Sequence, residues 1–252
     1  MRYGKMLLPA CLGALLFASQ AASAQTTDPK KVLVATANAL GMVRGVAHSL
    51  DVVNMFEYTA SGTLAGPGVG QGKVSRITVG YDYMIPAIRV DVEKTVPNGE
   101  TRREVTVAAG PLAWDESTPG IFSRRTNVPA FERLRQIWIM PHAVVLEGAK
   151  APDKVRVAER GGATELIVPG PDGSEIRATL DAKNFPIHVE MDVGARTYSG
   201  DFADYKDFQE YGVMFPSRIS QKIDGAPVAE FTVSEALANP YLIFPPPKEL
   251  KP

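Results

Sequence analysis

The sequence predicts an α+β fold in which one large antiparallel sheet is covered by an N-terminal helix and by short helices from the middle of the chain. Apolar and polar residues alternate at 88–92, 176–180 and 187–193, which is typical of strands that bury one face. Turn sequences such as those at 170–175 and 223–228 separate the apolar runs at intervals that suit consecutive antiparallel strands. No segment predicts a helix long enough to connect parallel strands, so a parallel sheet is not expected.

The N-terminal part of the chain predicts one helix followed by strands. Asp28 and Pro29 suit the cap and the first position of a helix. Apolar residues then recur at mixed three- and four-residue spacing, which predicts a helix over 28–48 with a bend near Gly41. The period changes to two at 55–62 and again at 74–83, which predicts two strands joined by a glycine-rich loop.

Two further strands are expected at 86–94 and 103–109. An Asn-Gly pair between them favours a tight hairpin. Within the second strand, Val105 and Val107 are expected to face the interior of the protein.

Residues 127–150 predict two short helices that meet at a proline. Asn127 can cap the first helix, and Pro141 must break or kink the chain between the two. The second helix is expected to cover 143–147. Farther along the chain, Pro216 requires an edge or bulged position in its strand because it cannot donate a hydrogen bond.

The composition gives no sign of a nucleic-acid-binding protein. The 27 lysines and arginines against 28 acidic residues give a net charge of −1, so no basic field attracts a polyanion. The 20 prolines and 22 glycines predict many turns.

The first 24 residues predict a signal peptide. Arg2 and Lys5 precede an apolar stretch at 7–18, and the small residues at 22–24 form a cleavage site before Gln25. The apolar stretch is too short to span a bilayer easily, and no other segment reaches that length, so no transmembrane segment is expected in the mature protein. The expected mature protein is a single domain, residues 25–252, in the periplasm.

The only cysteine, Cys11, lies within the predicted signal peptide. Residues 8–11 loosely resemble a lipoprotein cleavage box, but Pro9 and the short apolar stretch before it disfavour this alternative. The expected mature chain has no cysteine for a disulfide, so its stability must come from a hydrophobic core.

No catalytic or metal-binding pattern is found in the sequence. The histidines are His48, His142 and His188, and no pair of them has the spacing of a zinc site. His142 follows a proline and is expected to be a capping or partly buried residue. The glycine-rich segment 66–72 lacks the Lys-Ser/Thr ending of a phosphate-binding loop. We therefore expect a non-enzymatic protein with no catalytic residue, no metal and no cofactor.

The C-terminal third carries a series of short motifs, which are Asp204-Tyr205-Lys206, Gly212-Val213, Phe215-Pro216, Ile223-Asp224-Gly225, Phe231-Thr232-Val233, Asn239, Phe244 and Pro245-Pro246. With these motifs the chain resembles the LolA/LolB-like family of periplasmic carriers, which includes the outer-membrane lipoprotein carriers. Elsewhere the resemblance rests only on the order of the elements, with a helix first and further helices in the middle. The segment 66–72 and the lack of an arginine suited to lipoprotein transfer depart from the family.

The resemblance implies a LolA-like sheet curved as an incomplete barrel, with an apolar ligand such as a lipid or acyl chain between the sheet and the helices. The best candidates for lining that site are the apolar residues of the middle helices, which are Phe131, Leu134, Ile137, Trp138, Met140, Val144 and Val145. The alternative is that these residues form plain core. The protein would then be an envelope interaction or scaffold protein with a filled core and no small-molecule ligand, and its partner would be another envelope protein.

Overall fold

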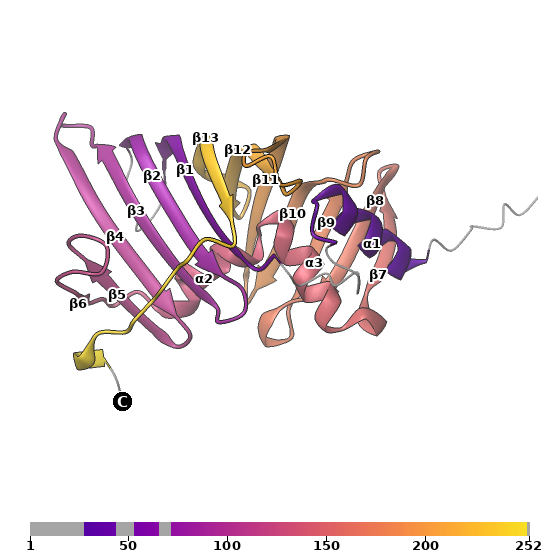
Figure 1. Cartoon of the computed structure of the whole chain (residues 1–252), viewed down its shortest axis with the longest axis horizontal. Coiled ribbons are helices and arrows are strands. Elements are labelled where there is room, and N and C mark those ends of the chain that lie inside the picture. The colour runs from indigo at the N-terminus through magenta and orange to yellow at the C-terminus, as the bar shows by residue number, and fades with distance from the viewer. Residues whose placement is uncertain (1–27, 44–52, 66–71, 251–252) are drawn as a thin grey trace, which may run out of the picture.

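The computed structural model describes residues 28–43, 53–65 and 72–250. Within these ranges the chain forms one 13-stranded sheet with the order β6-β5-β4-β3-β2-β1-β13-β12-β11-β10-β9-β8-β7 (Figure 1). Every neighbouring pair of strands in this sheet is antiparallel. The strands are β1 (Met55–Leu64), β2 (Gly72–Asp82), β3 (Ala87–Thr95), β4 (Thr101–Ala109), β5 (Leu112–Glu116), β6 (Arg124–Arg125), β7 (Arg156–Arg160), β8 (Ala163–Pro169), β9 (Glu175–Leu180), β10 (Pro186–Val193), β11 (Arg196–Asp207), β12 (Met214–Ile223) and β13 (Ala226–Ala238).

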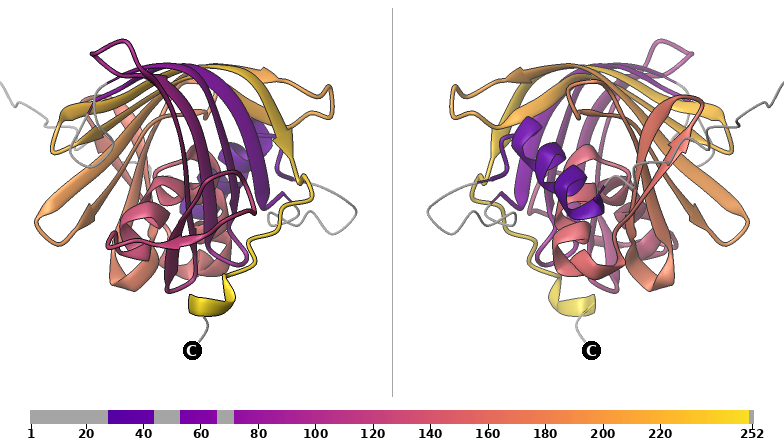
Figure 2. Two further views of the ribbon diagram at one scale, coloured as in Figure 1. Left: turned by 90° about the vertical axis from the view of Figure 1, so that its left-hand side faces the viewer. Right: turned by 90° about the vertical axis from the view of Figure 1, so that its right-hand side faces the viewer.

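The sheet arches over the three α-helices of the described residues, which lie on its concave side (Figure 2). They are α1 (Pro29–Ala39), α2 (Ala130–Trp138) and α3 (Pro141–Lys150). Helix α2 packs on β3, β4 and β5, while α3 packs on β8, β9 and β10 and contacts α1. Short 3-10 helices follow at Pro152–Lys154, Pro171–Gly173 and Lys248–Leu250. The predicted α+β fold with a large, curved antiparallel sheet is confirmed.

The main core fills the space between the concave face and the helices. Strand residues that alternate along β1, β2 and β3 enter it, as the period-two pattern predicts. At its centre His142 lies against the rings of Phe56 and Phe215, with centroid distances of 4.1 and 5.5 Å. No helix within the described ranges is long and apolar enough to cross a membrane.

Helix α1 begins as predicted and ends earlier than predicted. The Asp28 side chain accepts a hydrogen bond from the Lys30 backbone N–H at 3.0 Å and caps the first turn. The helix ends at Ala39 instead of continuing to residue 48, because Gly41 has a φ of 69° and turns the chain away. A Cβ atom on Gly41 would lie 1.6 Å from the carbonyl oxygen of Gly212, so only glycine fits this close approach.

The two middle helices meet at Pro141, as predicted. Helix α2 ends at Trp138 and α3 begins at Pro141, whose missing N–H is tolerated at the first position of a helix. The predicted cap was wrong: Pro129 occupies the N-cap of α2, and its side chain makes no capping hydrogen bond. Asn127 lies two residues farther upstream.

A second, smaller core lies on the opposite, convex face of the sheet. Val105, Val107 and Trp114 form it, and the C-terminal segment covers it with Phe244 and Leu250. Val105 and Val107 are buried, as expected, but in this second core and not in the core between the sheet and the helices. Thr106 and Ala108 point to the concave side, since they are the residues opposite Val90 and Ile88 of β3. The valines are buried because the C-terminal segment crosses the outside of the sheet (Figure 1).

The buried carboxylate of Glu116 forms hydrogen bonds and an ion pair with several residues around this convex core. Glu116 accepts hydrogen bonds from the indole N–H of Trp114 at 2.8 Å and from the backbone N–H of Gly120 at 2.6 Å. Arg89 forms an ion pair with Glu116 at 3.1 Å and donates to the carbonyl of Ile243 at 3.1 Å. The network fixes the C-terminal segment and the loop after β5 to the same strands.

Candidate functional site

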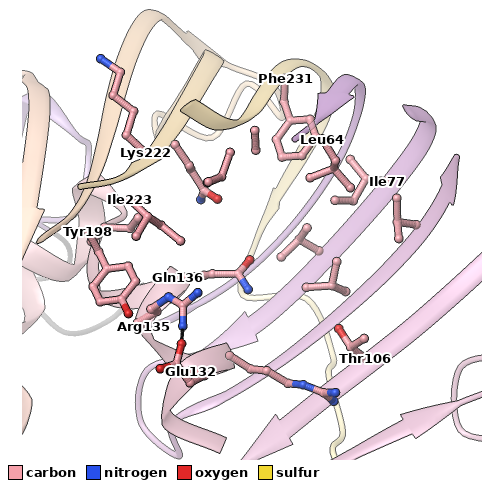
Figure 3. Close-up of a pocket in the computed structure, with 18 of the residues that line it drawn as sticks. Leu64, Ile77, Thr106, Glu132, Arg135, Gln136, Tyr198, Lys222, Ile223 and Phe231 are labelled. Carbon is pink, nitrogen blue, oxygen red and sulfur yellow. Dashed lines mark ion pairs between the residues drawn. The ribbon is translucent and has the colours of Figure 1, made fainter. Parts of the chain in front are cut away.

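An apolar cavity of about 230 Å³ lies between the concave face of the sheet and helix α2 (Figure 3). Its wall comes from both halves of the sheet and from one side of the helix. The lining residues are Tyr58, Leu64, Ile77, Val79, Val90, Val92, Glu104, Thr106, Val128, Glu132, Arg133, Arg135, Gln136, Ile139, Tyr198, Gln221, Lys222, Ile223, Val228, Ala229 and Phe231.

The apolar part of the wall is built from rows of cross-strand neighbours. Tyr58 of β1 lies opposite Val79 of β2, which lies opposite Val90 of β3. One pair farther along, Ile77 lies opposite Val92. Because side chains of directly opposed residues point to the same face, each row presents a continuous apolar strip to the cavity.

Helix α2 turns its polar side to the cavity. Glu132, Arg135 and Gln136 are spaced by three and four residues and lie on one side of the helix. The apolar Ile139, which follows the helix directly, lines the cavity as well. In Figure 3, Arg135 and Gln136 extend from the helix toward the space beneath the strands that carry Leu64 and Phe231. The apolar side of α2, with Leu134, Ile137 and Trp138, faces elsewhere.

Arg135 lies at one end of the cavity, where two neighbouring groups fix its position. Its guanidinium lies 4.3 Å from the ring centroid of Tyr198 and forms an ion pair with Glu132. Burial lowers the pKa of Arg135, because the charged form loses hydration. The cation–π contact and the ion pair offset part of that lost hydration.

Arg133 anchors α2 to the sheet. Its buried guanidinium donates to the carbonyl oxygens of Val107 and Trp114 and to the side chains of Asp115 and Thr126, at 2.6 Å in the case of Asp115. These groups belong to β4, to β5 and to the segment just after β6. The arginine therefore fixes the position of the helix relative to these strands.

Every charged residue on the cavity wall has a partner within the protein. Glu104 pairs with Lys94 at 2.9 Å, and Lys222 pairs with Asp201 at 2.6 Å. Arg133 pairs with Asp115, and Arg135 with Glu132, as described above. A ligand in this cavity does not need a charge of its own to neutralise the wall.

A more open groove of about 460 Å³ lies on the other side of α2. Phe131, Leu134 and Trp138 line it, together with the turn at 171–174 and the residues 191–194 at the end of β10. Phe131 is 50% exposed, whereas Leu134 and Trp138 are buried. Three of the seven predicted lining residues are thus brought together in this groove.

The other four predicted residues lie in the core. Ile137, Met140, Val144 and Val145 are each at most 2% exposed, and they line neither the cavity nor the groove. Ile137 also accepts a hydrogen bond from the hydroxyl of Tyr83 through its carbonyl, at 3.0 Å. Whether any of the seven contacts a ligand stays a prediction.

The sequence reasoning missed the residues that line the cavity. The polar side of α2, with residues 132, 135 and 136, is visible in the sequence, but a charged helix face is usually solvated, so it gives no signal for a cavity. The lining residues of β1, β2 and β3 belong to predicted strands, and only the curvature of the sheet brings them opposite α2.

No group of three or more potential metal ligands occurs among the described residues. His142 is fully buried instead of capping a helix, and its Nε2 lies 2.9 Å from the Met214 carbonyl oxygen. Burial lowers the pKa of His142 to about 4, so it is neutral at neutral pH. His188 lies beside Asp201, with 2.6 Å between Nδ1 and the carboxylate, and His48 lies outside the described residues.

Comparison with known proteins gives a structural likeness only. No protein-family model matches the sequence, and no curated protein is significantly similar to it. A solved structure of a LolA superfamily protein from Nitrosomonas europaea aligns with a TM-score of 0.46 and 15% sequence identity, over 86% of this chain and 96% of that one. The identity is low and the TM-score is modest, so the function rests on the residues of the site itself.

Proposed function

We propose that the protein is a non-enzymatic periplasmic carrier that binds one apolar chain, such as the acyl chain of a lipid, in the cavity beneath β1, β2 and β3. The observation that carries the proposal is the cavity itself, about 230 Å³ in volume and walled by apolar strand residues. An apolar cavity of about 150 Å³ is large enough to bind benzene, and pockets for drug-sized ligands hold about 300–1,000 Å³. The volume suits part of a flexible chain.

The charge pattern favours a neutral apolar segment over a charged group inside the cavity. All the charged residues of the wall are already paired with protein groups. Each methylene removed from water contributes about 0.8 kcal/mol, so about 6–8 buried methylenes give a Kd on the order of 0.1 mM or tighter. The resemblance of the C-terminal motifs to periplasmic carriers and the signal-peptide pattern at 1–24 support the same role.

Calorimetric titration with decanol and with decanoate tests the proposal. We expect saturable binding of decanol at least as tight as that of decanoate, because the carboxylate finds no unpaired cation in the cavity wall. Ala229 lies on the cavity wall, and Ala229→Leu should weaken decanol binding about tenfold by occupying the space of about two methylenes. The variant should keep or raise the Tm, since it fills space.

The matched control is Phe131→Ser, which changes the groove on the other side of α2 and should leave decanol binding unchanged. If Phe131→Ser abolishes binding and Ala229→Leu does not, the groove is the ligand site. If neither ligand binds saturably, the carrier function is refuted, and an envelope interaction protein with a filled core is the better account.

A further inference from the structure

The segment 117–131, which runs from the end of β5 into the first turn of α2, combines exposed apolar side chains with positive charge. It contains two arginines and no acidic residue, while acidic residues flank it at both ends. Ile121, Phe122, Val128 and Phe131 are all exposed. The segment includes β6, the last strand at one edge of the sheet (Figure 1).

Phe122 is the most unusual residue of this segment. Its side chain is 82% exposed, and its backbone has a φ of 51°, which L-residues other than Asn, Asp and His rarely adopt. The conformation is unfavourable, and burial of the ring does not compensate for it. An unfavourable backbone conformation in a surface loop points to a contact with another molecule.

The loop that carries Phe122 is held in place by hydrogen bonds. The N–H of Gly120 donates to the buried carboxylate of Glu116 at 2.6 Å, and the N–H of Ile121 donates to the Thr118 carbonyl at 2.9 Å. The N–H of Ser117 in turn donates to the Ile121 carbonyl at 3.3 Å. The turn therefore holds two neighbouring apolar side chains at its tip.

Two arginines follow this tip directly. Arg124 is 77% exposed and lies 4.0 Å from Asp115, a carboxylate that is already held by Arg133 at 2.6 Å. Arg125 is exposed as well. Apolar side chains beside basic ones, without acids between them, complement a surface that is anionic outside and apolar beneath.

We propose that this segment docks the protein on the surface of a bilayer that contains anionic phospholipid. Ile121 and Phe122 enter the boundary between headgroups and acyl chains, and Arg124 and Arg125 lie at the level of the lipid phosphates. The segment is also continuous with the two hollows of the protein, because Val128 lines the cavity and Phe131 lines the groove. Docking would bring both hollows close to the source of an apolar chain.

Flotation with lipid vesicles tests this proposal. Vesicles of phosphatidylcholine alone are compared with vesicles of phosphatidylcholine and phosphatidylglycerol at low salt. The protein should bind the anionic vesicles. Phe122→Asn should weaken this binding about tenfold, and Asn also suits a positive φ, so the variant should fold. Arg124→Gln together with Arg125→Gln should weaken it by about fivefold for each charge removed.

Tyr241→Asn is the matched control, because Tyr241 is an aromatic side chain that is 90% exposed elsewhere on the surface. This variant should bind like the unchanged protein. All the proteins carry the same N-terminus, so the apolar residues 7–18 cannot cause a difference between them.

The proposal is overturned if the unchanged protein does not float with anionic vesicles, or if Phe122→Asn floats equally well. Loss of binding in Tyr241→Asn to the same extent would also overturn it. If sedimentation shows self-association that Phe122→Asn abolishes, and vesicles do not bind, the segment is a contact between copies instead. Phe122, Arg124 and Arg125 do not line the cavity, so their variants test docking separately from ligand binding in the cavity.

Discussion

Arg133 and Arg124 both lie near one carboxylate, and their burial decides how much each contributes to the free energy of unfolding. Both lie near Asp115, but the side chain of Arg133 is 8% exposed and that of Arg124 is 77% exposed. Arg133→Gln should lower the free energy of unfolding by about 3–5 kcal/mol, because it leaves a partly buried carboxylate and two backbone carbonyls without their donor. Arg124→Gln should change it by less than ~0.5 kcal/mol. Urea unfolding of the two variants checks this, and equal losses would contradict the anchoring role of Arg133.

His142 should make the stability depend on pH. Its pKa is about 4 in the folded protein and about 6.5 in the unfolded chain, so the unfolded chain binds the extra proton between these values. The stability from neutral His142 is fully present above about pH 6.5 and is lost as the pH falls toward 4, by about 1.4 kcal/mol per unit.

In His142→Phe this dependence should disappear. The difference in unfolding free energy between pH 7 and pH 4.5 should be about 2 kcal/mol smaller in the variant than in the unchanged protein. Urea unfolding at both pH values measures this difference. The carboxylates that titrate in the same range are the same in both proteins, so their contribution cancels in the comparison. An unchanged difference would mean that His142 is not the titrating group.

At the scale of elements, a comparison of Gly41 with Gly99 distinguishes the cost of a steric clash from the cost of a positive φ. Gly41 and Gly99 both have positive φ, at 69° and 84°. A Cβ on Gly41 would lie 1.6 Å from the Gly212 carbonyl oxygen, whereas a Cβ on Gly99 would meet nothing within 4 Å. Gly99→Ala should lower the stability by about 1–2 kcal/mol, and Gly41→Ala by at least ~3 kcal/mol. Thermal unfolding compares them, and similar losses would show that the contact between Gly41, just after α1, and Gly212, just before β12, can relax.

The strands could be predicted because each one buries a single face and therefore carries a period of two. Even Pro216 follows its predicted rule: it lies opposite Tyr205 of β11, and β12 pairs with β13 only from Arg218 onward. The end of α1 could not be predicted, because it depends on the close approach of Gly41 to a residue 171 positions away in the sequence.

The candidate site could be predicted only in part, for a physical reason. The sequence identifies the apolar stripe of α2, and this stripe packs into the core and the adjoining groove. The cavity lies under the other stripe, where Arg135 and Gln136 face the arched strands. The curvature of the sheet and the anchoring of α2 by Arg133 determine which side of the helix faces the cavity. Neither of them produces a periodic pattern in the sequence.

At the scale of the whole molecule, the predicted signal peptide would place the protein in the periplasm. The residues 1–24 lie outside the described ranges, and the signal peptide stays a prediction from their pattern. N-terminal sequencing of the protein from the periplasmic fraction should give Gln25 as the first residue. A diacylated Cys11 at the start of the mature chain would contradict this and would place the protein on a lipid anchor.

The central claim is that an apolar chain binds between the concave face and α2, and methyl NMR during a titration with decanol tests it most directly. The account predicts saturable chemical-shift changes for the methyl groups of Ile77, Val79 and Val90, which line the cavity. The methyl groups of Val144 and Val145, which are buried residues of α3 away from the cavity wall, should not shift. Absence of saturable shifts, or shifts confined to Val144 and Val145, would contradict the claim.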